Sequence, residues 1–533
     1  MTSLTHTGTL VRLALRRDRI MLPVWIYALT AAVLSTAWAF RSLYATPESR
    51  VQLAASVGRN GSLRALYGPL FDPSSIGGLT AWRIEVFGAA LAGLMSLVVV
   101  VRHTRAEEEA ERLELVGSGA VGRRAPLTAA LITACGANLL VALLVAAGLI
   151  ILGQNAVGSL ALGLALAAAG IMFAALAAVA AQLTESSRTA TGIAGAALGL
   201  SYLLRAAGDA AGDGGASWLS WLSPLGWTEQ IRPFAGERWW VFGPVAVVVA
   251  VLAGAAYALA ARRDLGAGFL PSRPGPAQAG PGLRSPLALA WRLQRGTLLG
   301  WTGGFLVAGA VFGGIAEGVA DLVRGNSQLE DLVRRMGGER GIVDSFLAST
   351  MGLLGMLAAI YATQATLRLR AEETGQRAEP VLATAVNRPR WAGSHLVFPA
   401  LGTVVLLIAA GLTAGVTHGL RTHDLGRQVP TLIEAALVQA PAAWVLAAVA
   451  AAMYGLAPRI AAASWAVLAA VLFLGWFGPV LRLDQRVMDV SPFTHIPKIP
   501  GAALSAAPMA WLVAITAAGT AAGLAGLRRR DIG

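Results

Sequence analysis

Long apolar stretches dominate this sequence and limit the folds that it can adopt. Twelve of them follow one another along the whole chain, and an α-helix of about 20 residues crosses the roughly 30 Å hydrocarbon core of a membrane. Charged residues make up 13% of the chain, about half their share in soluble domains. A series of soluble domains is therefore excluded, and the predicted fold class is all-α, a polytopic membrane protein with twelve transmembrane helices. The predicted spans are residues 21–40, 81–101, 128–152, 158–181, 189–208, 241–261, 297–316, 346–366, 393–417, 431–455, 460–480 and 503–527.

Several residue types that carry chemistry are scarce. The chain has one cysteine, Cys135, and its six histidines are scattered, so neither an intrachain disulfide nor a metal site is expected. A phosphate-binding loop needs a lysine after a glycine-rich turn, but the single lysine, Lys498, lies in Ile-Pro-Lys-Ile-Pro. We therefore expect no catalytic residue and no cofactor in this chain. If ATP drives its work, another polypeptide hydrolyses it.

Basic residues set the predicted orientation in the membrane. With the N-terminus in the cytoplasm, most arginines fall in cytoplasmic segments, in agreement with the positive-inside rule. The formal net charge of +13 then resides on that face, where it favours contact with anionic lipids and gives no reason to invoke a nucleic acid. We predict a multi-pass protein of the plasma membrane with both termini in the cytoplasm.

The two halves of the chain resemble each other, which indicates an internal repeat. Arg-Ala-Glu-Glu at 105–108 recurs at 370–373, and Ser-Pro at 223–224 recurs at 491–492. The halves also begin alike, with Leu-Ala-x-Arg, and end alike, with Arg-Arg-Asp followed by Leu or Ile and Gly. Because each half has an even number of spans, both start on the same side and form parallel six-helix repeats. The predicted halves are residues 1–264 and 285–533, joined by a Pro/Gly-rich cytoplasmic linker over 265–284.

Each half carries two charged elements on its predicted cytoplasmic side. Residues 7–19 and 285–296 have the pattern of amphipathic elbow helices in the membrane interface, which either anchor the first span or also contact a partner. After the second span, Glu108 and Arg112 have the i, i+4 spacing of a helical ion pair, and the second half repeats it. Such a helix in both halves suits docking into a partner, and a solvated loop helix is the alternative.

Together these features resemble a known family. Two six-span halves, an amphipathic start to each, a charged helix after the second span and Ser-Pro before the sixth are similar to the ABC-type exporter permeases of the type-2 (type V exporter) class. The Arg-Ala-Glu-Glu loop and Ser-Pro-Leu-Gly-Trp at 223–227 look closest to the fused-half antibiotic exporter permeases of actinobacteria, of the tetronasin-resistance kind. Two features depart from the class: the second half has Thr-His at 494–495 in place of Gly-Trp, and the outer loops at 41–80 and 317–345 are long.

The resemblance implies a permease that exports a hydrophobic or amphipathic compound, such as an antibiotic, a drug or a lipid-like molecule. Two copies of a separate cytoplasmic ABC ATPase would bind ATP and Mg²⁺ and would dock on coupling helices at 105–116 and 370–381. Re-entrant outer segments would lie at about 217–238 and 484–501, before the last span of each half.

The candidate site residues follow from this resemblance and from the cost of placing ionisable groups in hydrocarbon. The residues expected to dock the ATPase are Arg105, Glu107, Glu108, Arg112 and Glu114, and then Arg370, Glu372, Glu373, Arg377 and Glu379. The substrate-pathway candidates are Arg83, Glu85, Arg205 and Glu434, unless these are interfacial residues whose charged ends reach water. The outer-gate candidates are Trp218, Trp221, Trp227, Pro224 and Pro492.

Two other classes of protein stay open as alternatives. An ion-coupled secondary transporter often has twelve spans in two parallel halves, but it should carry charges deep in several spans and a Gly/Arg-rich loop after the second. A membrane-embedded enzyme, for example a lipid-linked transferase, would need a cluster of acids or histidines near the membrane, and the outer acids form no Asp-x-Asp motif. The acidic, helical loop after the second span favours the exporter over both.

Overall fold

The computed structural model describes two compact units, Met1–Pro274 and Gly275–Gly533, and each is treated by itself. Within the described part of the chain, every regular element is a helix, which confirms the predicted all-α class. The described residues are 3–59, 61–113, 119, 121–211, 217–264, 266–270, 278, 280–323, 338–477, 484–501 and 505–530.

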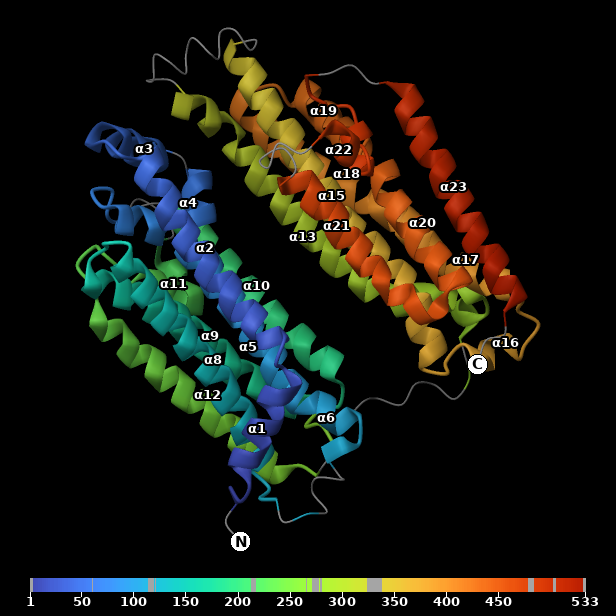
Figure 1. Cartoon of the computed structure of the whole chain (residues 1–533), viewed down its shortest axis with the longest axis horizontal. Helices are drawn as coiled ribbons and strands as arrows, with labels where there is room; N and C mark the ends of the chain where they lie inside the picture. The colour runs from blue at the N-terminus through green and yellow to red at the C-terminus, as the bar shows by residue number, and fades with distance from the viewer. Residues whose placement is uncertain are drawn as a thin grey trace. The chain divides into compact units, whose positions relative to one another are not determined.

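Unit 1 is a bundle whose long helices run side by side (Figure 1). Its helices are α1 (Thr7–Arg17), α2 (Met21–Leu43), α3 (Pro47–Arg59), α4 (Gly61–Tyr67), α5 (Ile76–His103), α6 (Arg105–Glu109), α8 (Ala125–Ile151), α9 (Ala156–Leu183), α10 (Ser187–Ala211), η2 (Ser217–Leu222), α11 (Pro224–Glu229), η3 (Trp239–Val241) and α12 (Phe242–Arg262).

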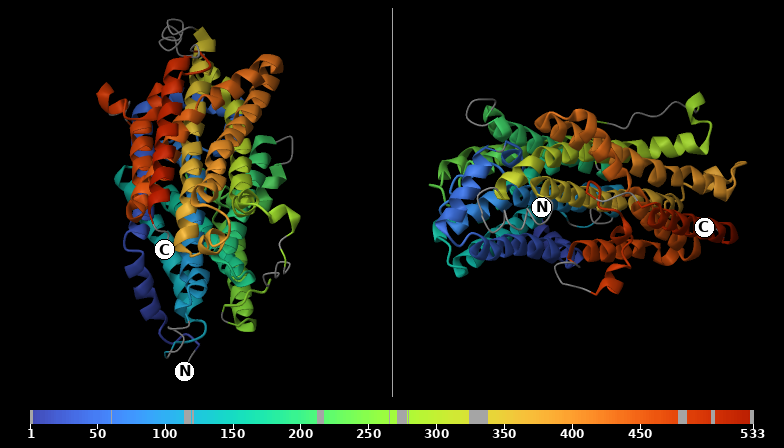
Figure 2. Two further views of the ribbon diagram at one scale, coloured as in Figure 1. Left: turned by 90° about the vertical axis from the view of Figure 1, so that its right-hand side faces the viewer. Right: turned by 90° about the horizontal axis from the view of Figure 1, so that it is seen from above.

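Unit 2 is a second bundle of the same kind, which Figure 2 shows from two further sides. Its helices are η4 (Pro281–Leu283), α13 (Pro286–Val323), α15 (Gly338–Thr374), α16 (Glu379–Leu382), α17 (Arg388–Val397), η5 (Phe398–Gly402), α18 (Thr403–Thr422), α19 (Leu425–Leu437), α20 (Ala440–Leu456), η6 (Pro458–Ala463), α21 (Ser464–Phe477), α22 (Gln485–Met488), η7 (Pro492–His495) and α23 (Ala506–Arg529).

The described residues contain 12 helices, or runs of helices, that are long and apolar enough to cross a membrane. The predicted number of spans is therefore confirmed, and most of the boundaries move by only a few residues. The largest shift is at the seventh span, where residues 286–296 of the predicted elbow helix form one helix with the span in α13. In unit 1 the corresponding α1 is a separate helix because Asp18 caps its end and is fully buried against Arg102, 3.0 Å away.

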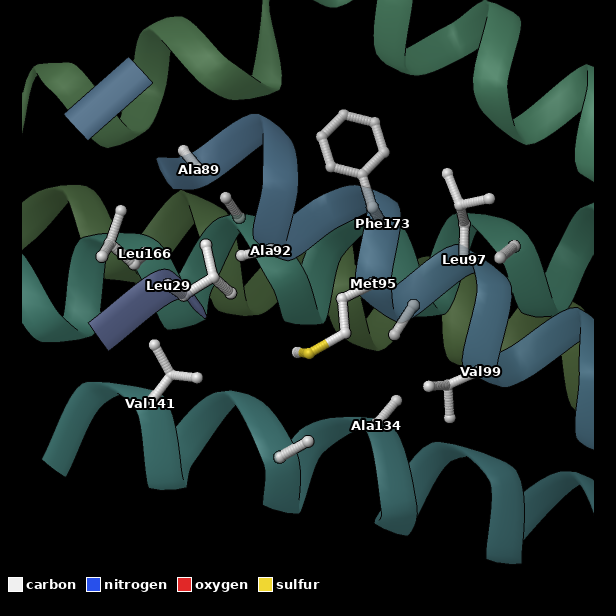
Figure 3. Packing of buried hydrophobic residues seen from close by; sticks show 14 of the residues in the cluster. Leu29, Ala89, Ala92, Met95, Leu97, Val99, Ala134, Val141, Leu166 and Phe173 are labelled. Carbon is white, nitrogen blue, oxygen red and sulfur yellow. The ribbon is translucent and has the colours of Figure 1, made fainter. Parts of the chain in front are cut away.

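The core of unit 1 lies around α5 and α9, the two most buried spans of that unit. Figure 3 shows the centre of this cluster, where Met95 of α5 and Phe173 of α9 lie among aliphatic side chains. Most of the buried residues of α9 are alanines. Such small side chains let neighbouring membrane helices approach closely. At Gly163 of α9, an added Cβ would lie 2.4 Å from the backbone oxygen of Ala142 in α8, so a larger residue would force these helices apart.

The neighbours of each span recur in unit 2. In unit 1, α9 contacts α5, α8 and α12, and α2 contacts α5 and α8. In unit 2, α20 contacts α15 and α23, α19 contacts α18, and α13 contacts α15 and α18. In both units, therefore, the second span packs against the first and the fourth, and the third span packs against the first and the fourth.

The close approach at Gly163 leads to a stability prediction. We expect Gly163→Leu to lower the thermal unfolding midpoint of the purified chain by about 2–5 °C, because overpacking costs about 1–3 kcal/mol. Gly199→Leu is the matched control, since a Cβ there meets nothing within 4 Å, and it should leave the midpoint unchanged. Intrinsic tryptophan fluorescence in mild detergent measures both, and equal midpoints would contradict the packing.

Candidate functional site

Each unit carries a charged turn, residues 105–112 and 370–377, after its second span. The helix of the first turn, α6, has only five residues, and Glu111 then adopts a left-handed conformation with a φ of 56°. Gln376 is its counterpart in the second turn and has a φ of 54°. A left-handed residue ends a helix, so both charged helices are shorter than predicted. Glu114 lies outside the described residues.

The second glutamate of each charged turn binds the arginine that follows the last helix of its unit. Oε1 of Glu108 lies 2.6 Å from Nη2 of Arg263, and Oε2 of Glu373 lies 2.6 Å from Nη2 of Arg530. The side chains of Glu108 and Arg263 are 7% and 8% exposed, so solvent screens their pair only weakly. These two ion pairs fasten the charged turns to the ends of α12 and α23.

The first glutamate of each turn binds the arginine five residues later. Nε of Arg112 lies 3.0 Å from Oε2 of Glu107, and Nε of Arg377 lies 3.0 Å from Oε2 of Glu372. The predicted i, i+4 pair between Glu108 and Arg112 is therefore wrong, and so is its counterpart in the second half. The reason is the left-handed residue, which turns each arginine back towards the first glutamate.

Burial separates the predicted docking residues into two groups. Arg105 is buried, and its Nε and Nη2 donate to the backbone oxygen of Ala181 at 2.9 and 2.7 Å. Its role in this structure is to hold the turn against α9, which leaves it no free surface for docking. The side chains of Arg112 and Arg377 are 53% and 55% exposed, and Glu379 is exposed as well. These three residues can contact a partner.

A third contact recurs at the charged turns. Nη2 of Arg123 donates to the backbone oxygen of Arg263 at 2.8 Å, and Nη1 of Arg388 donates to that of Arg530 at 2.5 Å. Beside the second turn lies a groove of about 590 Å³, lined by Glu379, Leu382 and residues 386–389 together with Arg528. Arg370, at the start of the second turn, is half-buried.

The buried pair of Glu108 and Arg263 should show energetic coupling. We expect Glu108→Gln to lower the free energy of unfolding by about 3 kcal/mol, because it leaves Arg105 and Arg263 buried without the carboxylate that they share. Arg263→Gln should cost less, since Glu108 keeps its pair with Arg105. The double variant should lose less than the sum, by at least about 1 kcal/mol. Equilibrium unfolding in mixed micelles with sodium dodecyl sulfate measures this, and additive losses would contradict the pair. The exposed Glu379→Gln is the control, with a change within about 0.5 kcal/mol.

The segment before the last span of unit 1, residues 217–238, lies far from the charged turn. Figure 1 places α11 of this segment and α6 at opposite ends of unit 1. Glu85 and Arg105 are 20 residues apart along the second span, and a helix rises 1.5 Å per residue, so this end is about 30 Å from the turn. We call residues 217–238 and 484–501 the distal segments.

Arg205 is the centre of a buried polar network at the distal segment of unit 1. Its Nη1 lies 3.0 Å from Asp209 on the same helix and 3.4 Å from Glu229 of α11. Its Nη2 donates to the backbone oxygen of Ala65 at 2.5 Å, and Ser220 donates to Asp209 at 2.7 Å. One guanidinium thus joins α10, α11, η2 and α4.

Glu85 of α5 and Glu229 of α11 line the same small pocket beside Arg205. They are 5% and 3% exposed, and one oxygen of each, Oε1 of Glu85 and Oε2 of Glu229, has no hydrogen-bond partner. Burial raises the pKa of Glu229 well above its ordinary value, and the positive charge of Arg205 opposes this shift. Asp209 and Glu85 raise the pKa of Glu229 further, so the buried carboxyl groups of Glu85, Asp209 and Glu229 outnumber the one guanidinium, that of Arg205, which pairs with two of them.

The other pathway candidates do not join this network. Arg83 is exposed, and its guanidinium carbon lies 4.0 Å from the ring centroid of Tyr67. Glu434 is exposed on α19 in unit 2. Of the four residues predicted for a substrate pathway, the structure therefore brings together only Glu85 and Arg205.

Two of the outer-gate candidates, Trp221 and Trp227, contact each other in the distal segment of unit 1. Trp227 donates to the backbone oxygen of Trp221 at 2.6 Å, and Trp221 stacks on Trp240 with 5.8 Å between ring centroids. Trp218 is 60% exposed, and none of the three predicted tryptophans lines the pocket of Glu85 and Glu229. The two prolines begin short helices: Pro224 begins α11, and Pro492, which is buried, begins η7.

The raised pKa of Glu229 leads to a prediction on pH. The folded chain holds this proton more tightly than the unfolded chain, so its contribution to stability is complete below the ordinary pKa of 4.5 and is lost as the pH rises through the folded-state value. We expect the unfolding midpoint of Glu229→Gln, relative to wild type, to increase steadily above pH 4.5. Midpoints measured from pH 4 to 8.5 test this against the exposed Glu48→Gln, and parallel curves for all three chains would contradict it.

The distal segment of unit 2 borders a large cavity instead of a closed network. The cavity has a volume of about 830 Å³ and is lined by residues of α13, α15, α21, α22 and η7 together with Gln439 and residues 496–498. In the parts of the chain that the structure describes, no group of three or more His, Cys, Asp and Glu side chains could hold a metal ion. A cavity of this volume with Phe and Met side chains in its lining is a candidate for an organic ligand.

Several residues at these sites were missed by the sequence reasoning. Arg263 and Arg530 carried a usable signal, because both belong to the repeated ending of the halves. Glu229 carried a weaker signal, since it follows the Ser-Pro motif by five positions. No signal in the sequence pointed to Glu111 or Gln376, because glutamate and glutamine have no preference for the left-handed conformation.

The fold and these two kinds of site define a multi-pass membrane protein with a repeated charged turn. Residues 283–528 match the family described as multidrug efflux system permease Rv1217c, C-terminal domain. Over 529 residues the chain is 43% identical to the multidrug efflux system permease protein Rv1217c of Mycobacterium tuberculosis. The alignment covers 99% of this chain and 95% of the relative. The chain belongs to this family of multidrug efflux permeases, and its resemblance to the ABC-type exporter permeases is confirmed.

Proposed function

We propose that this chain is the permease subunit of an ABC exporter that moves hydrophobic or amphipathic compounds out of the cell. ATP hydrolysis on a separate nucleotide-binding subunit supplies the energy, since the only lysine of the chain is not in a phosphate-binding loop. ATP and Mg²⁺ bind to that partner. Membership of the multidrug efflux permease family supports the class of substrate.

The observation that carries this proposal is the fastened charged turn in both units. Glu108 with Arg263 and Glu373 with Arg530 place two similar turns at the ends of two similar bundles. Each turn is ion-paired to the end of the last helix of its unit, so the movement of a bound partner can be transmitted to the spans. A loop without such a contact would move without displacing them. Two such turns suit two copies of one ATPase subunit and support the interpretation of the chain as two parallel six-helix repeats.

The exposed residues of the turns are the proposed contacts with the ATPase. Arg112 and Arg377 are more than half exposed, and Glu379 borders the groove beside the second turn. In the proposed orientation both turns and both termini are cytoplasmic, and the distal segments face outward.

Reversal of the exposed arginines tests this function. The tagged full-length chain is purified from its native membrane in mild detergent, and co-purifying proteins are identified by mass spectrometry. We expect a P-loop ATPase at about two copies per chain, reduced at least tenfold by Arg112→Glu combined with Arg377→Glu. Arg459→Glu is the matched control because Arg459 is an exposed arginine outside the turns, and it should retain the ATPase.

The outcomes of this experiment separate the exporter from its main competitor. An ATPase retained by the double reversal would move the docking site away from the turns. A wild-type chain that carries no ATPase would overturn the exporter and favour ion-coupled transport, for which the unpartnered oxygens of Glu85 and Glu229 are the specific observation. Uptake into inverted vesicles then decides: an exporter requires ATP, and an ion-coupled transporter stops when an ionophore collapses the proton gradient.

A further inference from the structure

The cavity of unit 2 and the small pocket of unit 1 occupy corresponding positions in the two halves. The repeated Arg-Ala-Glu-Glu motif sets an offset of 265 residues between the second spans. Because α5 and α15 are uninterrupted helices up to or beyond residues 103 and 368, this register holds along them. Ala81 and Glu85, which line the pocket, therefore correspond to Phe346 and Thr350, which line the cavity.

The distal segments give the same correspondence independently. The repeated Ser-Pro motif sets an offset of 268 residues there. Glu229, which lines the pocket of unit 1, then corresponds to Pro497, which lines the cavity of unit 2. The residue after it, Gln230 in unit 1, corresponds to Lys498 in unit 2, and Lys498 also lines the cavity.

Two differences between the halves explain why one position is closed and the other is open. In unit 1 the backbone of α11 packs directly on η2, since a Cβ added to Gly226 would lie 2.0 Å from the backbone oxygen of Ser220. The corresponding residue of unit 2 is Thr494, whose side chain lines the cavity. Arg205 also holds the helices around the first position together through its ion pairs with Asp209 and Glu229. Residues 464–477 of the fifth span in unit 2 carry no ionisable side chain that could do the same.

The sizes of the two spaces assign them different uses. The pocket of unit 1 measures about 10 Å³, which is at the limit for a single water molecule. The cavity of unit 2 measures about 830 Å³, within the range of pockets that bind drug-sized ligands. Of these two corresponding positions, only the one in the second half is large enough for a compound of the proposed substrate class.

The lining of the cavity specifies the chemistry of its ligand. Its apolar part includes Phe312, Phe346, Leu353 and Met356, and aromatic and methionine side chains adapt to varied apolar shapes. Its charged part is Lys498, the only lysine of the chain and the one ionisable residue among the described lining residues. Lys498 is exposed at the rim, so an anionic group can reach it while the rest of the ligand stays in the apolar part.

We propose that the cavity of the second half binds an amphipathic organic acid, with its apolar body beside Phe346 and Met356 and its carboxylate at Lys498, whereas the closed network of the first half binds no substrate. This inference rests on the proposed export function and narrows its substrate class. It also assigns the two distal segments different roles: the first is a polar joint between helices, and the second is a wall of the binding site.

A matched pair of probes tests the role of charge. The purified full-length chain in lipid nanodiscs is titrated with 11-(dansylamino)undecanoic acid and with its methyl ester, and dansyl fluorescence reports binding. We expect the acid to bind at least tenfold more tightly than the ester. Lys498→Gln should remove this preference, and Lys498→Arg should keep most of it. An acid affinity that Lys498→Gln leaves unchanged would overturn the proposal.

A cavity-filling variant tests the location. An added Cβ at Gly352, which lines the cavity, meets nothing within 4 Å, so Gly352→Leu fills the space without a clash. We expect it to weaken binding of both probes at least tenfold. Gly304→Leu is the matched control, since its Cβ also meets nothing within 4 Å and Gly304 lies outside the cavity. It should bind like wild type, as should Glu85→Gln in the first half. Unchanged binding by Gly352→Leu would overturn the assigned site.

These measurements use the permease alone, so they are independent of the test of the export function. Binding that fails in a chain that still co-purifies with its ATPase would overturn this site and leave the exporter. Binding as expected in a chain without an ATPase would support the site and overturn ATP-driven export.

Discussion

The constraint on which this structure depends is that hydrocarbon satisfies no hydrogen bond and screens no charge. Backbone groups in the spans must therefore bond within helices, and the described spans are helical. Ionisable side chains gather at the ends of the spans, and those that are buried are mostly paired, as Arg105 with Glu108 and Arg205 with Asp209. In unit 1, the charged turn pairs its buried charges at one end of the bundle, and the network at Arg205 pairs buried charges at the opposite end.

The two halves share the first of these arrangements and differ in the second. Each charged turn uses the same pairs of residue types, with Arg263 and Arg530 in the same role. At the distal segments the two halves differ, since the position in unit 1 is closed and the corresponding position in unit 2 is open. Gly226 and Glu229 close the first position, and Thr494 and Lys498 leave the second one open and charged.

Much of this architecture could be predicted because it depends on local properties of the sequence. Span number follows from the lengths of apolar runs, and the repeat of Arg-Ala-Glu-Glu located both charged turns. The pairing inside the turns could not be predicted in this way. Spacing favoured Glu108 with Arg112, but the left-handed Glu111 and the distant Arg263 decided the partner. Glu85 and Arg205 were found by their cost in hydrocarbon, whereas Glu229 was missed because it lies outside the spans.

The sequence by itself determined the fold class, the number of spans and the two positions at which charge is concentrated. These properties depend on hydrophobicity and on the spacing of residues within one segment of the chain. They can therefore be derived without knowing which helices contact each other. Only the tertiary structure decided which charges are buried, which arginine each glutamate binds, and that one distal position is closed while the other encloses about 830 Å³. These properties depend on how closely helices approach, as at Gly163 of α9, where the missing side chain lets the backbone of Ala142 in α8 come close.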